Sequence, residues 1–242
     1  MRSDVVRLFQ TLPHPCGYYP ERTAQNLVID PAESRLAALY DTALARGYRR
    51  AGGHVYLPHC QTCRACLASR IVVAEFEPDR SQRRCLKRNA DLSMEVTVAG
   101  FSDERHALYA RYLRKRHPGG GMDEAAPEDF TRFLYTSWSP TAFIEFRANG
   151  RLVAVAVTDL CSDALSAVYT FFDPAESARG LGTFAILSQI ELARARGLAY
   201  VYLGFWIPGH PKMDYKRRFH PLEILDGGRW VPTAHDDDFE RT

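Results

Sequence analysis

The segment from Trp206 to Lys216 concentrates more chemically useful side chains than any other part of the sequence, with aromatic, proline, histidine and charged residues in close succession. It directly follows an expected strand, and ligands of α/β sheets commonly bind at strand ends. A neighbouring carboxylate and phenol can accept and donate protons, which makes Asp214 and Tyr215 candidate catalytic residues. Trp206, Lys212 and Lys216 are candidate substrate-binding residues. The alternative is a rigid connection with solvated lysines.

A glycine-rich turn, Arg179-Gly180-Leu181-Gly182-Thr183, separates an expected strand from a long expected helix. Glycines at such a junction let backbone N–H groups approach an anion at the helix N-terminus. We therefore predict that Arg179, Gly180, Gly182 and Thr183 form an anion-binding turn. The turn resembles the one that holds the donor in GNAT acyltransferases, and this resemblance implies that it is the donor-binding turn. A tight turn that binds no ligand is the alternative.

Five basic residues recur at helical spacing between positions 80 and 88. If the segment is helical, they share one face and form a basic stripe. Such a stripe needs counter-charges, and the phosphates of a nucleic acid are the natural ones. A solvated face paired with scattered carboxylates is the alternative. The residues of the stripe are Arg80, Arg83, Arg84, Lys87 and Arg88.

Three cysteines lie within seven residues, at Cys60, Cys63 and Cys66. Close spacing of this kind suits thiolate ligands of zinc or an iron–sulfur cluster better than it suits disulfides. Cys16, in the run Cys16-Gly17-Tyr18-Tyr19, is the candidate fourth ligand. The sequence holds no second CxxC pair, so reduced thiols in a packed core are the alternative. The expected chemistry requires no cofactor.

The N-terminal part, residues 1–98, has the pattern of a small α+β unit. Asp30 and Pro31 predict a helix start, with Glu33 placed for a capping box and Gly47 ending the helix. Apolar residues at helical spacing fill the interval between them. The later patterns predict strands at His54–Leu57 and Ser69–Phe76, a helix at Arg80–Asn89 and a strand at Leu92–Val98.

The C-terminal part, residues 99–242, begins with two expected helices, Ser102–His117 and Pro127–Tyr135. Three expected strands follow, and Asn149-Gly150 predicts a tight hairpin between the first two. The helix after the glycine turn, a further strand, a short helix and a terminal hairpin complete the order. The three expected strands are Thr141–Arg147, Arg151–Leu160 and Ala164–Phe172, and the later elements are a helix ending near Arg196, a strand at Leu198–Gly204, a helix near Lys212–Phe219 and a hairpin at Gly227-Gly228.

This order resembles the GNAT acyltransferase fold. We therefore expect an α+β protein with a small cysteine-containing N-terminal domain over residues 1–98 and a GNAT-like domain over residues 99–242.

The composition is ordinary for a globular protein, with 46% hydrophobic and 25% charged residues and a net charge of only +2. No apolar run approaches the roughly 18–20 residues that a membrane-spanning helix needs. The first residues, Met1 to Thr11, contain Arg2, Asp4 and Arg7 and lack the apolar core of a signal peptide. We therefore expect a cytoplasmic protein with no membrane partner.

Taken together, these motifs resemble the arginyl-tRNA–protein transferase family over about residues 10–232. The most specific stretch is the Trp206–Lys216 segment with Phe219-His220-Pro221 after it. Eukaryotic members carry a second cysteine where Tyr19 stands here, so the resemblance is closest to the bacterial branch, the leucyltransferases. The other matching stretches are Cys16–Tyr19, the Cys60–Cys66 cluster, Ser81–Asn89, Tyr169–Pro174 and Gly180–Thr183.

The resemblance implies an aminoacyltransferase that moves leucine from leucyl-tRNA to the N-terminal amine of proteins beginning with Asp or Glu, marking them for degradation. Arginine as the donor amino acid is one alternative. A coenzyme-A-dependent GNAT N-acyltransferase is another, which would leave the basic stripe and the cysteines without a role. A zinc-containing RNA-binding module without enzymatic activity would leave the C-terminal fold without a role.

Overall fold

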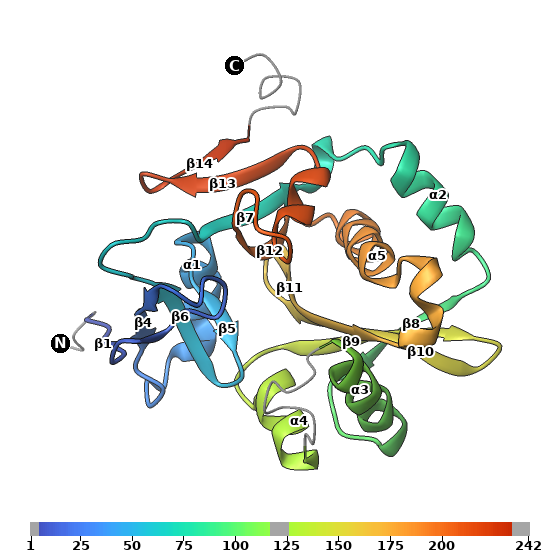
Figure 1. Ribbon diagram of the computed structural model, residues 1–242, viewed down its shortest axis with the longest axis horizontal. Helices are drawn as coiled ribbons and strands as arrows, with labels where there is room; N and C mark the ends of the chain where they lie inside the picture. Colours follow the sequence, from blue (N-terminus) through green and yellow to red (C-terminus); the bar gives the residue numbers. More distant parts are fainter. Residues whose placement is uncertain (1–4, 117–125, 234–242) are drawn as a thin grey trace. The chain divides into compact units, whose positions relative to one another are not determined.

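The computed structural model describes residues 5–116 and 126–233 (Figure 1). The chain forms two compact units, each assembled from segments that are distant in the sequence. Unit 1 contains residues 1–50, 54–76 and 202–242, and unit 2 contains residues 51–53 and 77–201. Within the described ranges, no helix is long and apolar enough to cross a membrane.

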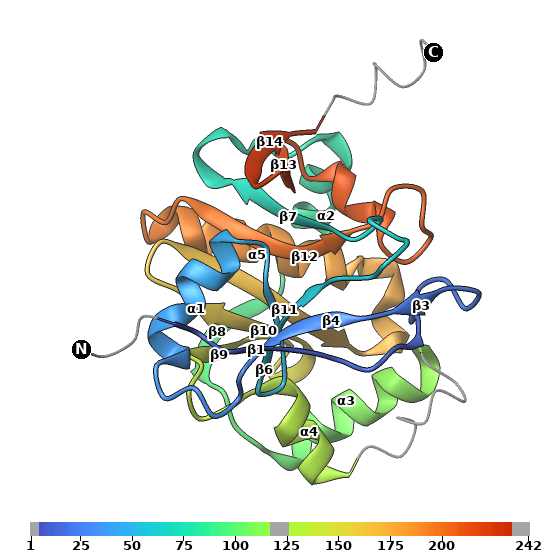
Figure 2. The ribbon, with the colours of Figure 1, turned by 90° about the vertical axis from the view of Figure 1, so that its left-hand side faces the viewer.

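Unit 1 contains an antiparallel sheet at its N-terminal end, in the order β1-β4-β6-β5. Strands β1, β4 and β6 lie side by side (Figure 2). The helix α1 (Leu36–Ala45) buries Leu36, Tyr40, Ala43 and Leu44. The bounds of the strands are β1 Leu8–Gln10, β4 Asn26–Ile29, β5 Arg49–Ala51 and β6 His54–Pro58, with a separate small hairpin of β2 His14–Pro15 and β3 Thr23–Ala24.

A second group of strands in unit 1 follows the order β14-β13-β7-β12. Strand β13 (Leu222–Asp226) pairs antiparallel with β7 (Leu67–Val72), and Leu222 lies opposite Ile71. The two-residue turn at Gly227 and Gly228, both with positive φ, joins β13 to β14 (Arg229–Pro232). Strand β12 (Tyr200–Trp206) carries the chain from unit 2 into unit 1, and the 3-10 helices η1 (Val73–Glu75) and η3 (Asp214–Arg218) follow β7 and β12.

Unit 2 is built on four antiparallel strands in the order β11-β10-β9-β8. The helices α3 (Asp103–Arg116) and α4 (Pro127–Leu134) lie on one face of these strands, and α5 (Leu181–Ala195) lies on the other (Figure 1). Helix α2 (Arg80–Arg88) packs against α5. The remaining bounds are β8 Ser93–Val98, β9 Thr141–Ala148, β10 Arg151–Leu160, β11 Ala164–Phe172 and the 3-10 helix η2 Pro174–Arg179.

Aromatic packing dominates the core of unit 2. Tyr109 of α3 and Phe130 of α4 are fully buried, and their ring centres lie 5.4 Å apart in an edge-to-face arrangement. Phe171 of β11 lies 5.3 Å from Tyr109 and 6.2 Å from Phe130. Burying one such ring stabilises a fold by about 1.5–3 kcal/mol, so this cluster holds both helices on the strands.

The predicted α+β fold and the GNAT-like order of elements are confirmed. The hairpin predicted at Asn149-Gly150 joins β9 to β10, and both residues adopt the positive φ that such a turn needs (48° and 82°). Two helices, three antiparallel strands, a helix and a strand then follow as predicted for the C-terminal part.

The compact units do not follow the division into residues 1–98 and 99–242 that the sequence predicts. Residues 202–242 belong to unit 1 because β13 pairs with β7. Residues 77–98 belong to unit 2 because α2 packs on α5 and β8 pairs with β9. Both assignments depend on contacts between residues far apart in the chain, which local sequence patterns do not predict.

Three local predictions are corrected. Helix α1 begins at Leu36 rather than Pro31, because Asp30 accepts a hydrogen bond from the Ala32 N–H (2.9 Å) and so forms a turn instead of a helix cap. The strand predicted over 69–76 ends at Val72 and continues as η1. The short helix predicted near 212–219 is the 3-10 helix η3.

Helix α2 has a complete capping box, in which the Asp79 carboxylate accepts from Gln82 N (2.7 Å) and the Gln82 side chain accepts from Asp79 N (2.8 Å). We expect Asp79→Ala to lower the free energy of unfolding by about 1 kcal/mol, because a helix N–H loses its acceptor. Urea denaturation followed by circular dichroism measures the change. The exposed Glu77 makes a matched control, and an Asp79→Ala loss no larger than that of Glu77→Ala would contradict the prediction.

Candidate functional site

The carboxylate of Asp214 fixes the course of the chain after β12. Its Oδ1 accepts hydrogen bonds from Trp206 Nε1 (3.1 Å) and from the Gly209 backbone N–H (3.0 Å), and its Oδ2 lies 3.3 Å from Arg217 Nε. Gly209 has a φ of 72°, which suits the tight turn that this carboxylate closes. Three donors occupy Asp214, so its geometry is that of a group that orients Trp206 and the turn.

His210 joins this turn to the N-terminal Cys-Gly-Tyr-Tyr run. Its Nδ1 lies 3.2 Å from the Lys212 backbone N–H, and its Nε2 lies 3.1 Å from the Tyr18 carbonyl oxygen. Because a backbone N–H can only donate, we assign the proton to Nε2, which donates to Tyr18. The rings of Tyr18 and Tyr19 meet the imidazole edge-on at 5.5 and 5.3 Å. The histidine is therefore held from both sides in unit 1.

The two lysines predicted to bind substrate lie in different environments. Lys216 is buried, with 3% of its surface exposed, and its Nζ donates to the Phe205 carbonyl oxygen. Burial, reinforced by the positive charge of Arg49, lowers the pKa of Lys216 to about 7. Lys212 is exposed and contributes its backbone N–H to His210. Tyr215 is 43% exposed, and Lys216 Nζ lies 5.5 Å from its ring centre.

Arg49 and Gly204 complete this region, and neither was predicted as a site residue. Gly204 interrupts β12 with a φ of 86°, and a Cβ at this position would lie 3.4 Å from Arg49 Nη2 and 3.8 Å from Lys216 Nζ. The Ser69 hydroxyl donates to the Gly204 carbonyl oxygen (2.9 Å). The sequence feature that could have indicated this region is the pair of consecutive arginines between two glycines. This short segment forms the buried strand β5.

The four candidate metal ligands lie in the same region of unit 1 without forming a metal site. Burial raises the pKa of the Cys66 thiol to about 11, and electrostatic interactions with Cys16, Cys60 and Cys63 act in the same direction. However, no three His, Cys, Asp or Glu side chains in the described residues are arranged to hold a metal ion. The Cys60 thiol instead donates to the Gln25 carbonyl oxygen at 3.7 Å. The residues do not fit a zinc ion or cluster in this arrangement, and no chemical step is assigned to one.

Cys63 has a different environment from the other thiols. The Ala65 backbone N–H lowers its pKa, and the Arg22 guanidinium, with Nη1 at 3.4 Å from Sγ, acts in the same direction. Arg22 also stacks over the Tyr19 ring at 4.1 Å from its centre. These contacts connect the cysteine cluster to the run that holds His210.

The basic stripe lies on α2 in unit 2, and all five of its residues are exposed. Two of them bond to backbone oxygens, Arg83 to Pro78 and Arg88 to Ala178 (2.6 Å). None of the five forms an ion pair with a carboxylate in the part of the chain that is described, whereas Arg147 and Arg151 of unit 2 do. The stripe is therefore a cationic surface whose charges are not balanced locally.

The predicted donor turn lies next to α2. Gly180 adopts a φ of 70° and precedes α5, and the Asn89 side chain of α2 donates to the Arg179 carbonyl oxygen (3.0 Å). The Arg179 guanidinium pairs with Asp91 (2.8 Å) and Glu176 (2.8 Å). The charge of Arg179 is thus balanced by carboxylates of the protein, and its part in donor binding stays a prediction that rests on the backbone of the turn.

Gly182 and Thr183 lie in the first turn of α5. A Cβ at Gly182 would meet Phe172 at 3.8 Å, which is an ordinary contact. Glycine is therefore needed for the backbone conformation at Gly180 but not for space at Gly182. The structure brings the turn together with α2 in unit 2, and it brings the Trp206–Lys216 segment together with the cysteines in unit 1.

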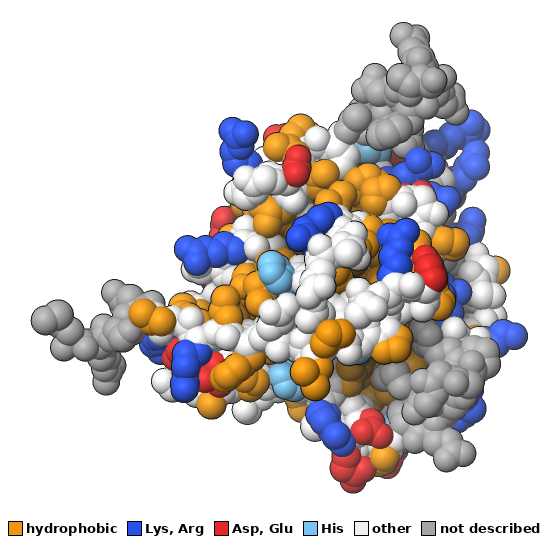
Figure 3. Space-filling model, turned by 60° about the vertical axis from the view of Figure 1, so that its left-hand side comes forward, with side chains coloured by type: hydrophobic (Ala, Val, Ile, Leu, Met, Phe, Trp, Pro, Cys, Tyr) orange, Lys and Arg blue, Asp and Glu red, His pale blue; other side chains and the backbone are white. Residues whose placement is uncertain are grey.

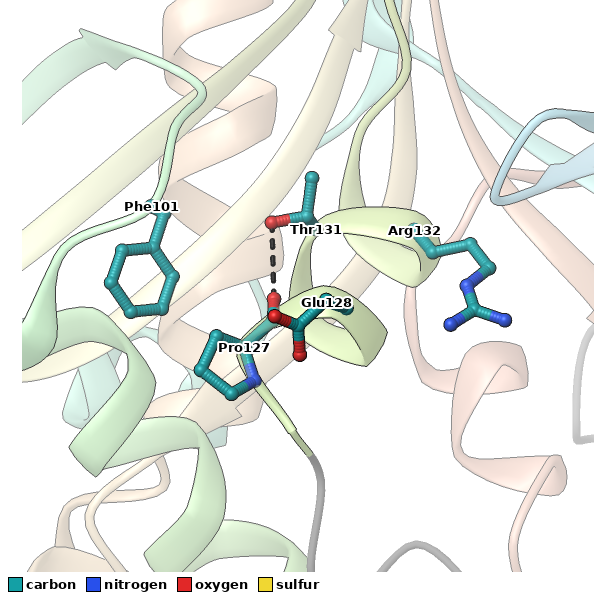
Figure 4. Close-up of a pocket in the computed structure, with 5 residues that line it drawn as sticks. All are labelled: Phe101, Pro127, Glu128, Thr131 and Arg132. Carbon is teal, nitrogen blue, oxygen red and sulfur yellow. Dashed lines mark hydrogen bonds between the residues drawn. The ribbon is translucent and has the colours of Figure 1, made fainter.

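A hollow of about 300 Å³ lies elsewhere in unit 2, lined by Phe101 and by residues at the start of α4 (Figure 4). The Thr131 hydroxyl donates to the Pro127 carbonyl oxygen (3.1 Å), and Arg132 points away from Phe101. The hollow holds no predicted site residue. On the face drawn in Figure 3, basic, acidic and apolar side chains are intermixed rather than gathered by charge.

Two family models match the chain. One, described as arginine-tRNA-protein transferase, C terminus, matches residues 104–226, and the other, described as its N terminus, matches residues 14–84. The chain belongs to the arginine-tRNA-protein transferase family. Within this family, an aspartate/glutamate leucyltransferase of Stenotrophomonas maltophilia (strain K279a) is 59% identical over 98% of this chain and 97% of its own. Another, of Xylella fastidiosa (strain 9a5c), is 52% identical over 95% of this chain and 92% of its own.

A solved structure of a more distant protein shares the fold. The C-terminal domain (DUF2156) of a protein described as a lysylphosphatidylglycerol synthetase, from Agrobacterium fabrum, has a TM-score of 0.51 and 16% identity, over 78% of this chain and 65% of that chain. The ribosomal-protein-S18-alanine N-acetyltransferase of Escherichia coli matches 45% of this chain and 64% of its own, with 17% identity and a TM-score of 0.34. Membership of the transferase family thus rests on the sequence relatives.

The hydrogen bonds of Asp214 distinguish a positioning role from proton transfer. We expect Asp214→Asn to keep most of the transfer activity, because an amide oxygen still accepts from Trp206 and Gly209. We expect Asp214→Ala to lower kcat about 100-fold, because a displaced reaction centre costs about that much. Single-turnover transfer onto a peptide measures both. A loss of about 10²-fold or more in Asp214→Asn would point to proton acceptance instead.

Proposed function

We propose that this protein transfers leucine from leucyl-tRNA to the N-terminal amine of proteins whose first residue is Asp or Glu, and thereby marks them for degradation. The observation that carries the proposal is the 59% identity over nearly the whole chain to a protein named for this activity. A free aminoacyl-tRNA is a cytoplasmic substrate, so we place the reaction in the cytoplasm.

The reaction is the aminolysis of an ester. The acceptor nitrogen attacks the carbonyl carbon of the leucyl ester, the bond from that carbon to the ribose oxygen breaks, and a proton passes from the amine to the ribose oxygen. The α-amine has a reference pKa of about 7.7–8.0, so a fraction is already neutral near pH 7. Orientation of amine and ester therefore contributes most of the acceleration.

The Trp206–Lys216 segment supplies the orienting groups in this proposal. The exposed ring of Tyr215 reaches solvent, and its hydroxyl would donate a proton to the leaving ribose oxygen. Asp214 holds Trp206, whose ring would contact the acceptor. Gly182 and Thr183 would bind the donor through the first backbone N–H groups of α5, and Gly180, with its positive φ, would shape the turn before them.

The exposed stripe on α2 would bind the phosphates of the tRNA. Each phosphate contact that a cationic side chain makes adds up to about 0.9 to the slope of log K against log salt. We expect Arg83→Ala, Arg84→Ala and Lys87→Ala in combination to weaken binding of leucyl-tRNA and to flatten this slope by up to about 0.9 for each lost contact. Filter binding between low and moderate salt measures the slope.

Arg132→Ala is a suitable control for the stripe, because this exposed arginine pairs with Asp129. It should leave the salt slope unchanged. If the folded triple variant keeps the wild-type slope, α2 does not bind the tRNA backbone.

A transfer assay with labelled donors tests the proposed function. We expect leucine from leucyl-tRNA, rather than arginine from arginyl-tRNA or acetate from acetyl-coenzyme A, to reach peptides that begin with Asp or Glu. Matched peptides that begin with Asn or Lys should react far more slowly, because a site that binds a carboxylate discriminates strongly against its absence. Preferential use of arginyl-tRNA or acetyl-coenzyme A would replace the proposal with the corresponding alternative.

A further inference from the structure

Three consecutive carbonyl oxygens, those of residues 178–180, accept hydrogen bonds from α2 and from the residue that ends it. They belong to the chain that leads into the glycine turn and α5. The donor and acceptor pairs are Arg88 Nη1 with Ala178 (2.6 Å), Asn89 Nδ2 with Arg179 (3.0 Å) and Cys85 Sγ with Gly180 (3.5 Å). One helix therefore holds three successive peptide groups of unit 2 beside the turn.

Asn89 is the central donor of this set, and only 1% of its surface is exposed. Its Nδ2 also donates to the Cys85 carbonyl oxygen (2.9 Å), so its two closest partners are carbonyl oxygens. Only the amide nitrogen can donate to them, which fixes the orientation of the side chain. The buried Oδ1 accepts no hydrogen bond from the described residues. Because an unpaired acceptor costs free energy, the two donated bonds are what an amide contributes at this position.

The Cys85 thiol holds the carbonyl oxygen at which α5 starts. Gly180 O also accepts from the Phe184 backbone N–H (3.0 Å), the first hydrogen bond of that helix. Burial raises the pKa of Cys85, so near pH 7 it is a neutral thiol that can donate. In a trans peptide the N–H points away from the preceding C=O, so the Leu181 N–H is directed away from α2. The first N–H groups of α5 have no partner within the helix and can bind a ligand.

Arg179 fastens the turn to α2 in the reverse direction. Its Nη1 donates to the Arg88 carbonyl oxygen (3.3 Å) at the end of α2, and its guanidinium pairs with Asp91 (2.8 Å) just beyond. Donors on each segment thus meet acceptors on the other, which restricts movement of the turn relative to α2.

The helix that makes these contacts also carries the basic stripe. Cys85 and Asn89 are four residues apart and lie on the buried side of α2, which packs on α5. The five residues of the stripe are exposed. The buried contacts of α2 therefore set the position of its exposed charges relative to the start of α5.

We propose that Asn89 and Cys85 are positioning residues for the donor, holding the glycine turn at a fixed distance from the stripe so that a tRNA bound to α2 presents its aminoacyl ester to the first N–H groups of α5. This inference rests on the proposed function and adds the residues that join its two donor contacts. Neither side chain needs to touch the ester, because both act through the backbone of the turn. A displacement of about 1 Å would lower the rate about 100-fold.

Asn89→Asp tests the proposal, because it keeps the size of the side chain but removes the N–H donors to Cys85 and Arg179. Transfer of labelled leucine from leucyl-tRNA to a saturating Asp-initiated peptide is measured in single turnover at increasing enzyme concentration. We expect the plateau rate to fall about tenfold to a hundredfold, because the turn is displaced. The enzyme concentration that gives half of this plateau should stay at the wild-type value, because the stripe is intact.

A purely structural role gives the opposite pattern. If Asn89 only stabilises the fold, its loss leaves less folded enzyme. The half-saturating concentration then rises while the plateau rate stays at the wild-type value, and this result would overturn the inference.

Gln189→Glu is the matched control. Gln189 is a fully buried amide of α5 whose Nε2 donates to Thr158 Oγ1 (2.7 Å) and whose Oε1 is also unpaired, so it bonds to β10 rather than to α2. The same change from amide to carboxyl should leave the plateau rate unchanged there. An equal fall in both variants would reveal a general effect of a buried carboxyl group and would also contradict the inference.

Cys85→Ala keeps the test decisive if Asn89→Asp does not fold. It removes the donor to Gly180 with little change in volume, and we expect the plateau rate to fall about twofold to tenfold, as for one lost hydrogen bond. Cys85→Ser, which retains a donor, should keep more of the rate. A folded Cys85→Ala enzyme with the wild-type plateau would refute the inference. If the wild type itself transfers no leucine from leucyl-tRNA, the proposed function fails instead.

Discussion

The structure of the candidate site in unit 1 depends on the carboxylate of Asp214. Because it accepts hydrogen bonds from the side chain of Trp206 and the backbone of Gly209, the chain turns sharply as β12 ends. The turn places His210 between Tyr18 and Tyr19 and directs Lys216 into the interior. One carboxyl group thus connects the end of a strand, the N-terminal run and a buried lysine.

Burial changes what each cation in this segment can do. An exposed lysine such as Lys212 is solvated and has no fixed partner, whereas Lys216 has exchanged water for one carbonyl oxygen and the nearby charge of Arg49. Burial therefore favours the neutral form of Lys216.

In unit 2, in contrast to the buried Lys216, many basic side chains form ion pairs. Several of its arginines form ion pairs with carboxylates, as Arg105 does with Glu145 and Arg179 does with Asp91 and Glu176. The exposed stripe on α2 is left without such partners, and α2 is fastened to the start of α5 through Asn89 and Cys85. A polyanion that binds the stripe would therefore be held at a fixed place relative to the glycine turn.

The sequence by itself determined the elements whose signals are local. These include the hairpin at Asn149-Gly150, the capped helix α2 with its basic face, and the Trp206–Lys216 motif, because turn chemistry, caps and periodicity act within a few residues. Only the tertiary structure decided that residues 202–242 join the N-terminal part, that Arg179 is neutralised, and that Arg49 meets Lys216 beside Gly204. Each of these depends on contacts between residues far apart in the chain, and burial then sets the charge balance that no spacing pattern reveals.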